Sequence, residues 1–214
     1  MTTPRLRRLG SLKELDGLLD RRNRESGPTE TIDRLIRNRF LFQVAVLVLD
    51  MADFSVSVRR NGIIAHLALI RRMNVLAGKE IVRTGGRVVK FEADNAFAVF
   101  PTMEKALEAS VAIQGVVAEA GGLMRVSIGL GHGPILLTRD DFFGDAVNMA
   151  SKLGEDLAGP GEILLTREAR KLLKGPRGHF EKLDFHVSGL RLPCFKWIGP
   201  VRPTSRKVKS STGR

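Results

Sequence analysis

Two aspartates carry the clearest chemical signal in this sequence of 214 residues. Asp50 closes the apolar run from Val44 to Leu49, and Asp94 lies within GGRVVKFEADNAFAVF, between two further strand-like runs. An unpaired carboxylate is costly to bury in an apolar interior, so each side chain must be paired, protonated or bound to a cation. Carboxylate oxygens are the ligands that hard divalent cations prefer. The alternative is that each aspartate caps a turn.

The strands that must hold these aspartates follow from the hydrophobic pattern. Residues 42–49 are apolar on both faces, which predicts a central strand of a sheet. Two short strands are expected at 87–91 and 96–100, joined by a hairpin with Asp94 at its tip. A further strand is expected over 124–137, interrupted by the glycines of IGLGHGPI.

Helices are expected between these strands. Apolar residues at spacings of three, four and seven predict a long helix that ends at Gly85-Gly86. Its expected buried face consists of Ile63, Leu67, Ile70, Ala77 and Ile81. A second helix is expected over 102–119, with Thr102 as its cap, and a third over 144–157. Residues 12–19 and 32–36 predict two short helices, separated by Ser26-Gly27-Pro28.

The predicted architecture is an α+β sandwich of the ferredoxin-like type. A strand over 162–166 and an antiparallel pair over 180–187 and 193–198 complete the series. The order is βαββαβ with an added helix and a C-terminal β-hairpin, with the helices stacked on one face of a largely antiparallel sheet. We expect three parts, namely an N-terminal helical extension, a central domain and a disordered basic tail, at residues 1–40, 41–200 and 201–214.

Composition narrows the setting and the partners. The single cysteine, Cys194, cannot form an internal disulfide, so we expect a reducing, cytoplasmic location. No run reaches the roughly 18 apolar residues of a membrane span. The net charge of +12 indicates an anionic partner, either nucleic acid, a membrane surface or a phosphate-bearing small substrate. No nucleic-acid motif accompanies the charge, so we do not expect a nucleic-acid partner. The basic tail is also compatible with a solvated segment.

Four stretches, LDMADFS, GGRVVKFEADNAFAVF, RVSIGLGHGPI and DFFGDAVNMASKL, occur in this order. Together they resemble the catalytic domain of class III nucleotidyl cyclases, from about Val44 to Trp197. The resemblance implies formation of a cyclic nucleotide and pyrophosphate from a nucleoside triphosphate, in intracellular signalling. It also implies that Asp50 and Asp94 hold two Mg²⁺ or Mn²⁺ ions per site. Such ions would activate the ribose 3′-hydroxyl and neutralise the triphosphate.

The resemblance assigns purine recognition to Lys90 and Asp141. A lysine opposite the adenine N1 acceptor and a carboxylate opposite the exocyclic amine would form a complementary pair. Guanine presents the reverse pattern and would leave both side chains badly paired, so ATP is the expected substrate. The alternative is that Lys90 is an ordinary lysine on an edge strand and Asp141 an ordinary residue of a turn.

Further roles follow from the same resemblance. Asn148 would orient the ribose, and Lys152, four residues on and on the same helical face, would stabilise the transition state. Lys152 stands where the family normally has arginine. Lysine keeps the positive charge but lacks the planar guanidinium that can bind two phosphate oxygens at once. The loop from Met51 to Ser55, which includes Phe54, would offer backbone N–H groups to the phosphates.

The chain also departs from the family pattern at three other positions. Asp53 and Ala93 replace glycines, and Ser188 replaces a lysine that touches the terminal phosphate, with Lys182 and Arg191 nearby. The expected function is a homodimeric adenylate cyclase, because in this family the metal aspartates of one subunit face the purine-reading residues of another. The alternative is a cyclase-fold module that binds nucleotide but has weak or no activity.

Overall fold

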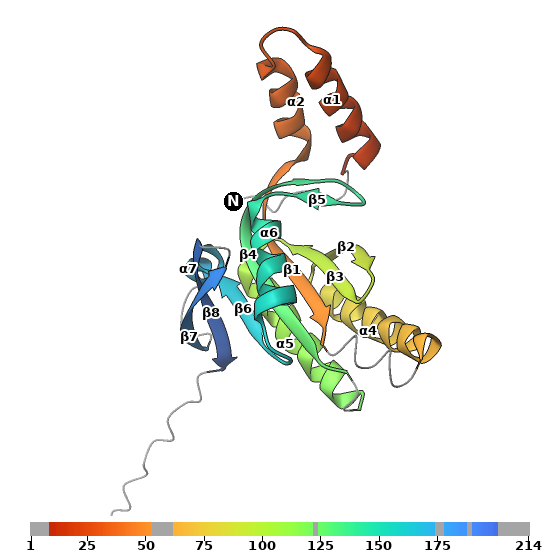
Figure 1. Cartoon of the computed structure of the whole chain (residues 1–214), viewed down its shortest axis with the longest axis vertical. Helices are drawn as coiled ribbons and strands as arrows, with labels where there is room; N and C mark the ends of the chain where they lie inside the picture. The colour runs from red at the N-terminus through yellow and green to blue at the C-terminus, as the bar shows by residue number, and fades with distance from the viewer. Residues whose placement is uncertain (1–8, 53–61, 122–123, 174–177, 188–189, 201–214) are drawn as a thin grey trace, which may run out of the picture.

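A computed structural model describes residues 9–52, 62–121, 124–173, 178–187 and 190–200. Its strands form one sheet in the order β2-β3-β1-β4-β6-β8-β7, with β5 paired to β4 (Figure 1). The strands are β1 (Leu41–Met51), β2 (Arg87–Glu92), β3 (Asn95–Phe100), β4 (Val126–Leu137), β5 (Phe142–Phe143), β6 (Ile163–Thr166), β7 (His179–Val187) and β8 (Leu190–Gly199). Within the described residues no helix is long and apolar enough to cross a membrane.

The helices are α1 (Leu12–Arg24), α2 (Glu30–Phe40), α4 (Ile63–Arg83), α5 (Met103–Glu119), α6 (Asp145–Ser151) and α7 (Arg167–Leu172). A π-helical segment, η2 (Lys152–Leu157), follows α6 directly. The first six elements of the central region run β1, α4, β2, β3, α5, β4, so the predicted βαββαβ order is confirmed. The added helix and the C-terminal hairpin of β7 and β8 are also present.

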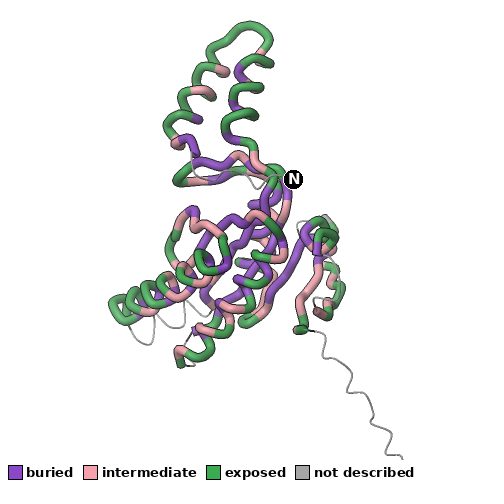
Figure 2. Tube along the Cα trace, turned by 180° about the vertical axis from the view of Figure 1, so that it is seen from behind, coloured by how far each residue is buried: buried purple, intermediate pink, exposed green. Residues whose placement is uncertain are grey.

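Helices cover both faces of the sheet, which corrects the expectation that they lie on one. Successive side chains of a strand point to opposite faces. In β1, Ala45, Leu47 and Leu49 belong to the core formed with α4 and α5. Val44, Val46 and Val48 belong to a second core that includes residues of α6. Figure 2 shows that the buried positions concentrate in the strands between these layers.

Strand β4 is continuous, so the expectation that its glycines interrupt it is wrong. A Cβ atom on Gly129 would overlap the carbonyl oxygen of Ala150, and one on Gly131 would overlap that of Ala146. The glycines therefore let the backbone of α6 lie directly against β4. The expected helix over 144–157 is likewise corrected, because its second half is the π-helical segment η2.

Helix α4 buries a different stripe from the predicted one. Ile70, Ala77 and Ile81 are buried as expected, whereas Ile63 and Leu67 are each 55% exposed. Figure 1 shows the N-terminal end of α4 projecting beyond the strands, and the exposed Ile63 and Leu67 belong to that end of the helix. The stripe is completed instead by His66 and Met73, which are both fully buried.

The β2–β3 hairpin places Ala93 in the left-handed backbone region, with a φ of 49°. Among the described residues it is the one non-glycine residue with positive φ. An L-residue with a Cβ is disfavoured there by roughly 1–2 kcal/mol, and glycine avoids that cost. The alanine at this position therefore restricts the hairpin tip beside Asp94.

Replacing Ala93 with glycine is expected to stabilise the fold by about 1 kcal/mol, because it removes this backbone strain. Urea denaturation measures the change. Ala68→Gly, at an exposed position inside α4, is the matched control and should destabilise by about the same amount. If both substitutions lower the free energy of unfolding, the backbone of Ala93 does not carry the strain inferred from its positive φ.

The α1–α2 hairpin joins the sheet through its base. Leu15, Ile32, Ile36 and Phe40 form its own small core. Leu9, just before α1, is buried in the core on the α6 side. The backbone N–H of Arg139 donates to the carbonyl of Gly10 at 2.9 Å, which ties this segment to the turn after β4.

Candidate active site

Asp50 and Asp94 meet at one end of the sheet. Asp50 pairs with Asn95 across β1 and β3, which places Asp94 at the adjacent hairpin tip. Asp50 has the same strand parity as Val44 and Val48, so its side chain faces the α6 side of the sheet. Burial and, after it, the charges of Asp94, Glu155 and Asp156 together raise the pKa of Asp50 to about 7. The two aspartates therefore form an acidic pair that a cation would relieve.

The donors at this pair fit a magnesium-type cation. Both carboxylates supply hard oxygen atoms, and the buried side-chain oxygen of the neighbouring Asn95 has no hydrogen-bond partner. In the part of the chain that the structure describes, no group of three or more His, Cys, Asp or Glu residues is arranged to hold a metal by itself. Mg²⁺ usually binds through one or two carboxylates plus substrate phosphates, which matches a pair rather than a closed cage.

Lys90 and Asp141, far apart in the sequence, are in direct contact. The Lys90 ammonium lies 3.2 Å from the Asp141 carboxylate and 3.0 Å from that of Glu92. It also lies 5.3 Å from the ring centroid of Phe97. Burial lowers the pKa of Lys90, but the bonds to Glu92 and Asp141 outweigh it, so the net shift is upward. Lys90 is therefore a cation held in place beside the carboxylate of Asp141, which accepts hydrogen bonds.

Asp141 is held by its own turn. Its backbone N–H donates to the Thr138 hydroxyl, and that hydroxyl donates to the Asp141 carbonyl, both at 2.9 Å. One oxygen of the Asp141 carboxylate also accepts from the backbone N–H of Phe142. The carboxylate that faces Lys90 is therefore pre-oriented.

Asn148 and Lys152 lie one turn apart, at the junction of α6 and η2. The backbone N–H of Lys152 donates to the carbonyl of Asn148. The Asn148 side chain is exposed, whereas the Lys152 ammonium lies 2.6 Å from the carboxylate of Asp156. The charge of Asp156 also contributes to the raised pKa of Asp50. The π-helical segment therefore places Lys152 near the acidic pair.

No family model matches the chain. A protein of Rhizobium meliloti named putative adenylate cyclase 3 is 27% identical over 174 residues, which cover 76% of this chain and 29% of that protein. An uncharacterised protein of Mycobacterium tuberculosis is 34% identical over 89 residues, covering 42% and 23%. The matched part therefore spans less than a third of these curated relatives.

Solved structures match over most of the chain. The adenylate/guanylate cyclase/hydrolase of Silicibacter pomeroyi is 27% identical, with a TM-score of 0.62, over 76% of this chain and 99% of that one. The adenylyl cyclase CyaB of P. aeruginosa is 19% identical, with a TM-score of 0.64, over 76% and 96%. The chain contains a class III adenylate/guanylate cyclase domain.

Two residues of this cyclase domain were missed by the sequence reading. Glu92 shares the ammonium of Lys90, and Asp156 pairs with Lys152. The signals were spacings of two along a strand and four along a helix, which place side chains on one face. Both spacings are too common on solvated surfaces to identify a site alone.

The suggested replacements for the missing phosphate-contacting lysine lie elsewhere in the cyclase domain. Lys182 is opposite Phe195 in the β7–β8 register, and Phe195 packs against the core on the α4 and α5 side. Lys182 and Arg191, which share that face by strand parity, therefore point away from the face of Asp50. Phe54, Asp53 and Ser188 lie outside the described residues.

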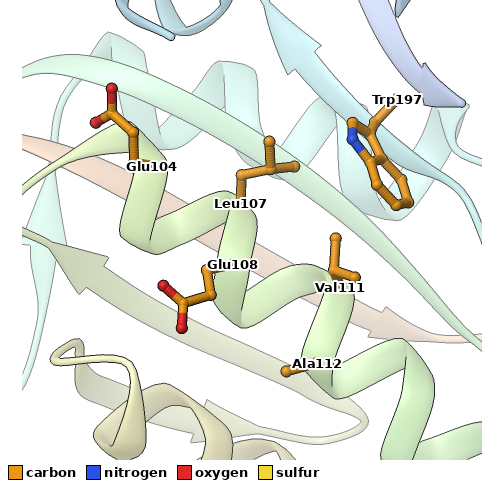
Figure 3. Close-up of a pocket in the computed structure, with 6 residues that line it drawn as sticks. All are labelled: Glu104, Leu107, Glu108, Val111, Ala112 and Trp197. Carbon is orange, nitrogen blue, oxygen red and sulfur yellow. The ribbon is translucent and has the colours of Figure 1, made fainter. Parts of the chain in front are cut away.

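The cyclase domain also has a groove between α5 and β8, on the side away from Asp50. It has a volume of about 420 Å³. Figure 3 shows Leu107 and Val111 on α5 across from Trp197, with Glu104 and Glu108 along the same helix. Trp197 is the only tryptophan, and the chain has no tyrosine, so intrinsic fluorescence reports on this side of the sheet alone.

Proposed function

We propose that this cyclase domain is an adenylate cyclase, which converts ATP to 3′,5′-cyclic AMP and pyrophosphate. The observation that carries the proposal is the contact between Lys90 and Asp141 at 3.2 Å. It sets a hydrogen-bond donor and an acceptor side by side at the positions that read the purine in this family. The Rhizobium relative, named a putative adenylate cyclase, supports the same substrate.

Adenine is the purine that this pair fits. The Lys90 ammonium has three N–H donors and no acceptor, so it can bond to N1 of adenine while it stays bonded to its acidic partners. Asp141 as a carboxylate only accepts, which suits the exocyclic amine of adenine. Guanine carries a donor at N1 and an acceptor at O6, and both would be unpaired.

Asp50 and Asp94 are the residues that would hold the divalent cations, Mg²⁺ or Mn²⁺. Class III cyclases use divalent metals. When bound, such ions supply charge neutralisation on the triphosphate and a lower pKa for the attacking ribose hydroxyl. The raised pKa of Asp50 supports this role, because a bound cation would offset both the burial of its carboxylate and the repulsion from Asp94.

Asn148 and Lys152 complete the proposed machinery. The exposed amide of Asn148 can orient the ribose, and the Lys152 ammonium can approach a phosphate oxygen as a point charge. The loop that contains Phe54 would then supply backbone N–H groups to the triphosphate. Phe54 enters this proposal through the sequence resemblance alone.

The active form in this proposal is a homodimer. Asp50, on β1, and the α6 helix that carries Asn148 and leads into Lys152 of η2 lie on the same side of the sheet. A second copy related by a twofold axis would bring an acidic half-site against a purine-reading half-site, twice. Activity per chain should therefore fall on dilution through the dimer dissociation range, as measured alongside sedimentation.

The deciding experiment is product analysis with ATP and GTP in parallel, in Mn²⁺ and in Mg²⁺. Cyclic AMP should form at least about tenfold faster than cyclic GMP, because a mismatched pair of buried hydrogen bonds costs roughly 1–3 kcal/mol or more. Chromatography of the products measures both rates. Equal rates, or faster formation of cyclic GMP, would refute the purine assignment.

The second candidate is a cyclase-fold nucleotide-binding module with weak activity. The ion pair of Lys152 with Asp156 favours it, because the substrate must displace a carboxylate before the lysine can reach a phosphate. The pair is 36% and 54% exposed, so the competition is modest in water.

Lys152→Arg discriminates between the two candidates. A guanidinium can bond two phosphate oxygens at once while the ammonium acts as a point charge, so the variant should gain about tenfold in kcat with little change in KM. Initial rates with ATP and Mn²⁺ measure the gain. A gain of about a hundredfold or more would show that the natural site is degenerate, and a loss would show that the site is built around lysine. Lys171→Arg, on α7, is the matched control and should change neither constant.

A further inference from the structure

A cationic pocket lies in the C-terminal part of the domain. It has a volume of about 510 Å³ and is lined by Arg167, Lys182, Arg191, Pro193 and Phe195. Volumes of roughly 300–1,000 Å³ are typical of small-molecule sites. Three elements contribute its positive charge, namely the first residue of α7 and one residue each from β7 and β8.

The pocket is separate from the candidate active site. Lys182 pairs with Phe195 across β7 and β8, and Asp184 pairs with Pro193, so these side chains share one face. Phe195 packs against the core formed with α4 and α5, whereas Asp50 faces α6. The sheet therefore lies between the two sites.

The charges in the pocket are only partly compensated. The Arg191 guanidinium donates from Nε to the Asp184 carboxylate at 2.6 Å and also contacts that carboxylate through Nη2, which fixes its orientation and leaves Nη1 to face a ligand. Arg167 and Lys182 are exposed, and neither has an ion pair or hydrogen bond with another described side chain. The pocket therefore has two exposed cations and one guanidinium held by a single carboxylate, that of Asp184.

The remaining wall is apolar. Phe195 and Pro193 lie two residues apart on the same face of β8. They line the pocket with an aromatic ring and a flat aliphatic surface beside the cations. An inorganic anion would use only the charged side of such a pocket. A ligand that has a planar ring and a phosphate would use both sides, because aromatic faces stack and arginine binds phosphate oxygens.

We propose that this pocket binds a nucleoside phosphate, with the phosphate at Arg167 and Lys182 and the base against Phe195 and Pro193. It would be a site for nucleotide as a ligand and not as a substrate. Its occupancy would be independent of divalent cations, because no carboxylate pair lies in its lining. The proposal does not depend on the activity of the Asp50 face.

The test is calorimetric titration of the full chain with AMP in the presence of a metal chelator, with Trp197 fluorescence as a second readout. Trp197 lies two residues from Phe195 on the same face of β8. One AMP should bind per chain, and the Arg167→Gln/Lys182→Gln double variant should bind at least about tenfold more weakly, as expected for loss of two charge-assisted contacts. Lys171→Gln removes a charge from the same helix and should bind like the natural chain.

Three arms separate the explanations. Lys90→Gln, which alters the proposed purine-reading pair, should bind AMP unchanged, and loss of binding in that variant would assign the AMP to the catalytic face and overturn the proposal. Adenosine and inorganic phosphate should each bind at least about tenfold more weakly than AMP; equal binding of phosphate would refute the nucleotide assignment. Unchanged AMP binding by the double variant would refute the pocket, and thermal melts verify that the exposed substitutions leave the fold intact.

Discussion

Asp94→Ala is expected to lower the rate of cyclic AMP formation by about a thousandfold or more. The variant removes one of two carboxylates that would hold the divalent cations, and metal stabilisation of a transferring phosphoryl group contributes several kcal/mol. Each 1.4 kcal/mol is about tenfold in rate. Initial rates with saturating ATP and Mn²⁺ measure the effect.

The same variant should not lose stability, which separates a chemical role from a structural one. The charge of Asp94 acts unfavourably on Asp50, so its removal relieves repulsion in the metal-free protein. The melting temperature of Asp94→Ala should therefore equal or exceed that of the natural chain. Glu119→Gln, at the far end of α5, serves as the charge control. An Asp94→Ala protein that keeps a tenth of the activity would contradict the metal-ligand role.

Gly129→Ala is expected to prevent folding. The added Cβ would overlap the carbonyl oxygen of Ala150 and lie 2.5 Å from the backbone nitrogen of Gly154. Both obstacles are backbone atoms of α6 and η2, which cannot move aside without separating the helix from β4. The cost should approach the whole stability of a domain, which is about 5–15 kcal/mol.

Urea denaturation and soluble yield measure this effect. Gly115→Ala is the matched control, because a Cβ there meets nothing within 4 Å and the residue is exposed on α5. Alanine should stabilise that helix by up to about 1 kcal/mol. A soluble Gly129→Ala protein with normal stability would show that α6 does not pack against β4 as described.

Local patterns predicted the parts of the fold that depend on one segment at a time. β1 was predicted from its apolar run, α5 from its Thr102 cap and periodicity, and the hairpin from the polar residues between two strands. The path of α6 was not predictable in this way. The glycines of β4 are required by the close contact of this strand with α6. In the sequence alone, the same glycines are typical of an interrupted strand.

Single-segment patterns missed other features for similar reasons. The change to π-helix at Lys152 does not alter the hydrophobic periodicity, and α7, with six residues, spans fewer than two helical turns, too few to establish a periodicity. In the candidate site, the proximity of Asp50 and Asp94 follows from strand pairing. The contact of Lys90 with Asp141 could be anticipated only through the family resemblance, because nothing in the intervening residues relates β2 to the turn after β4.

The Arg139 backbone is the meeting point of two distant parts of the chain. Its N–H bonds to Gly10, and its carbonyl accepts from the guanidinium of Arg87 at 2.7 Å. Asp141 follows two residues later, so only two peptide bonds separate this junction from the residue that contacts Lys90. The α1–α2 hairpin is therefore tethered beside the contact between Lys90 and Asp141.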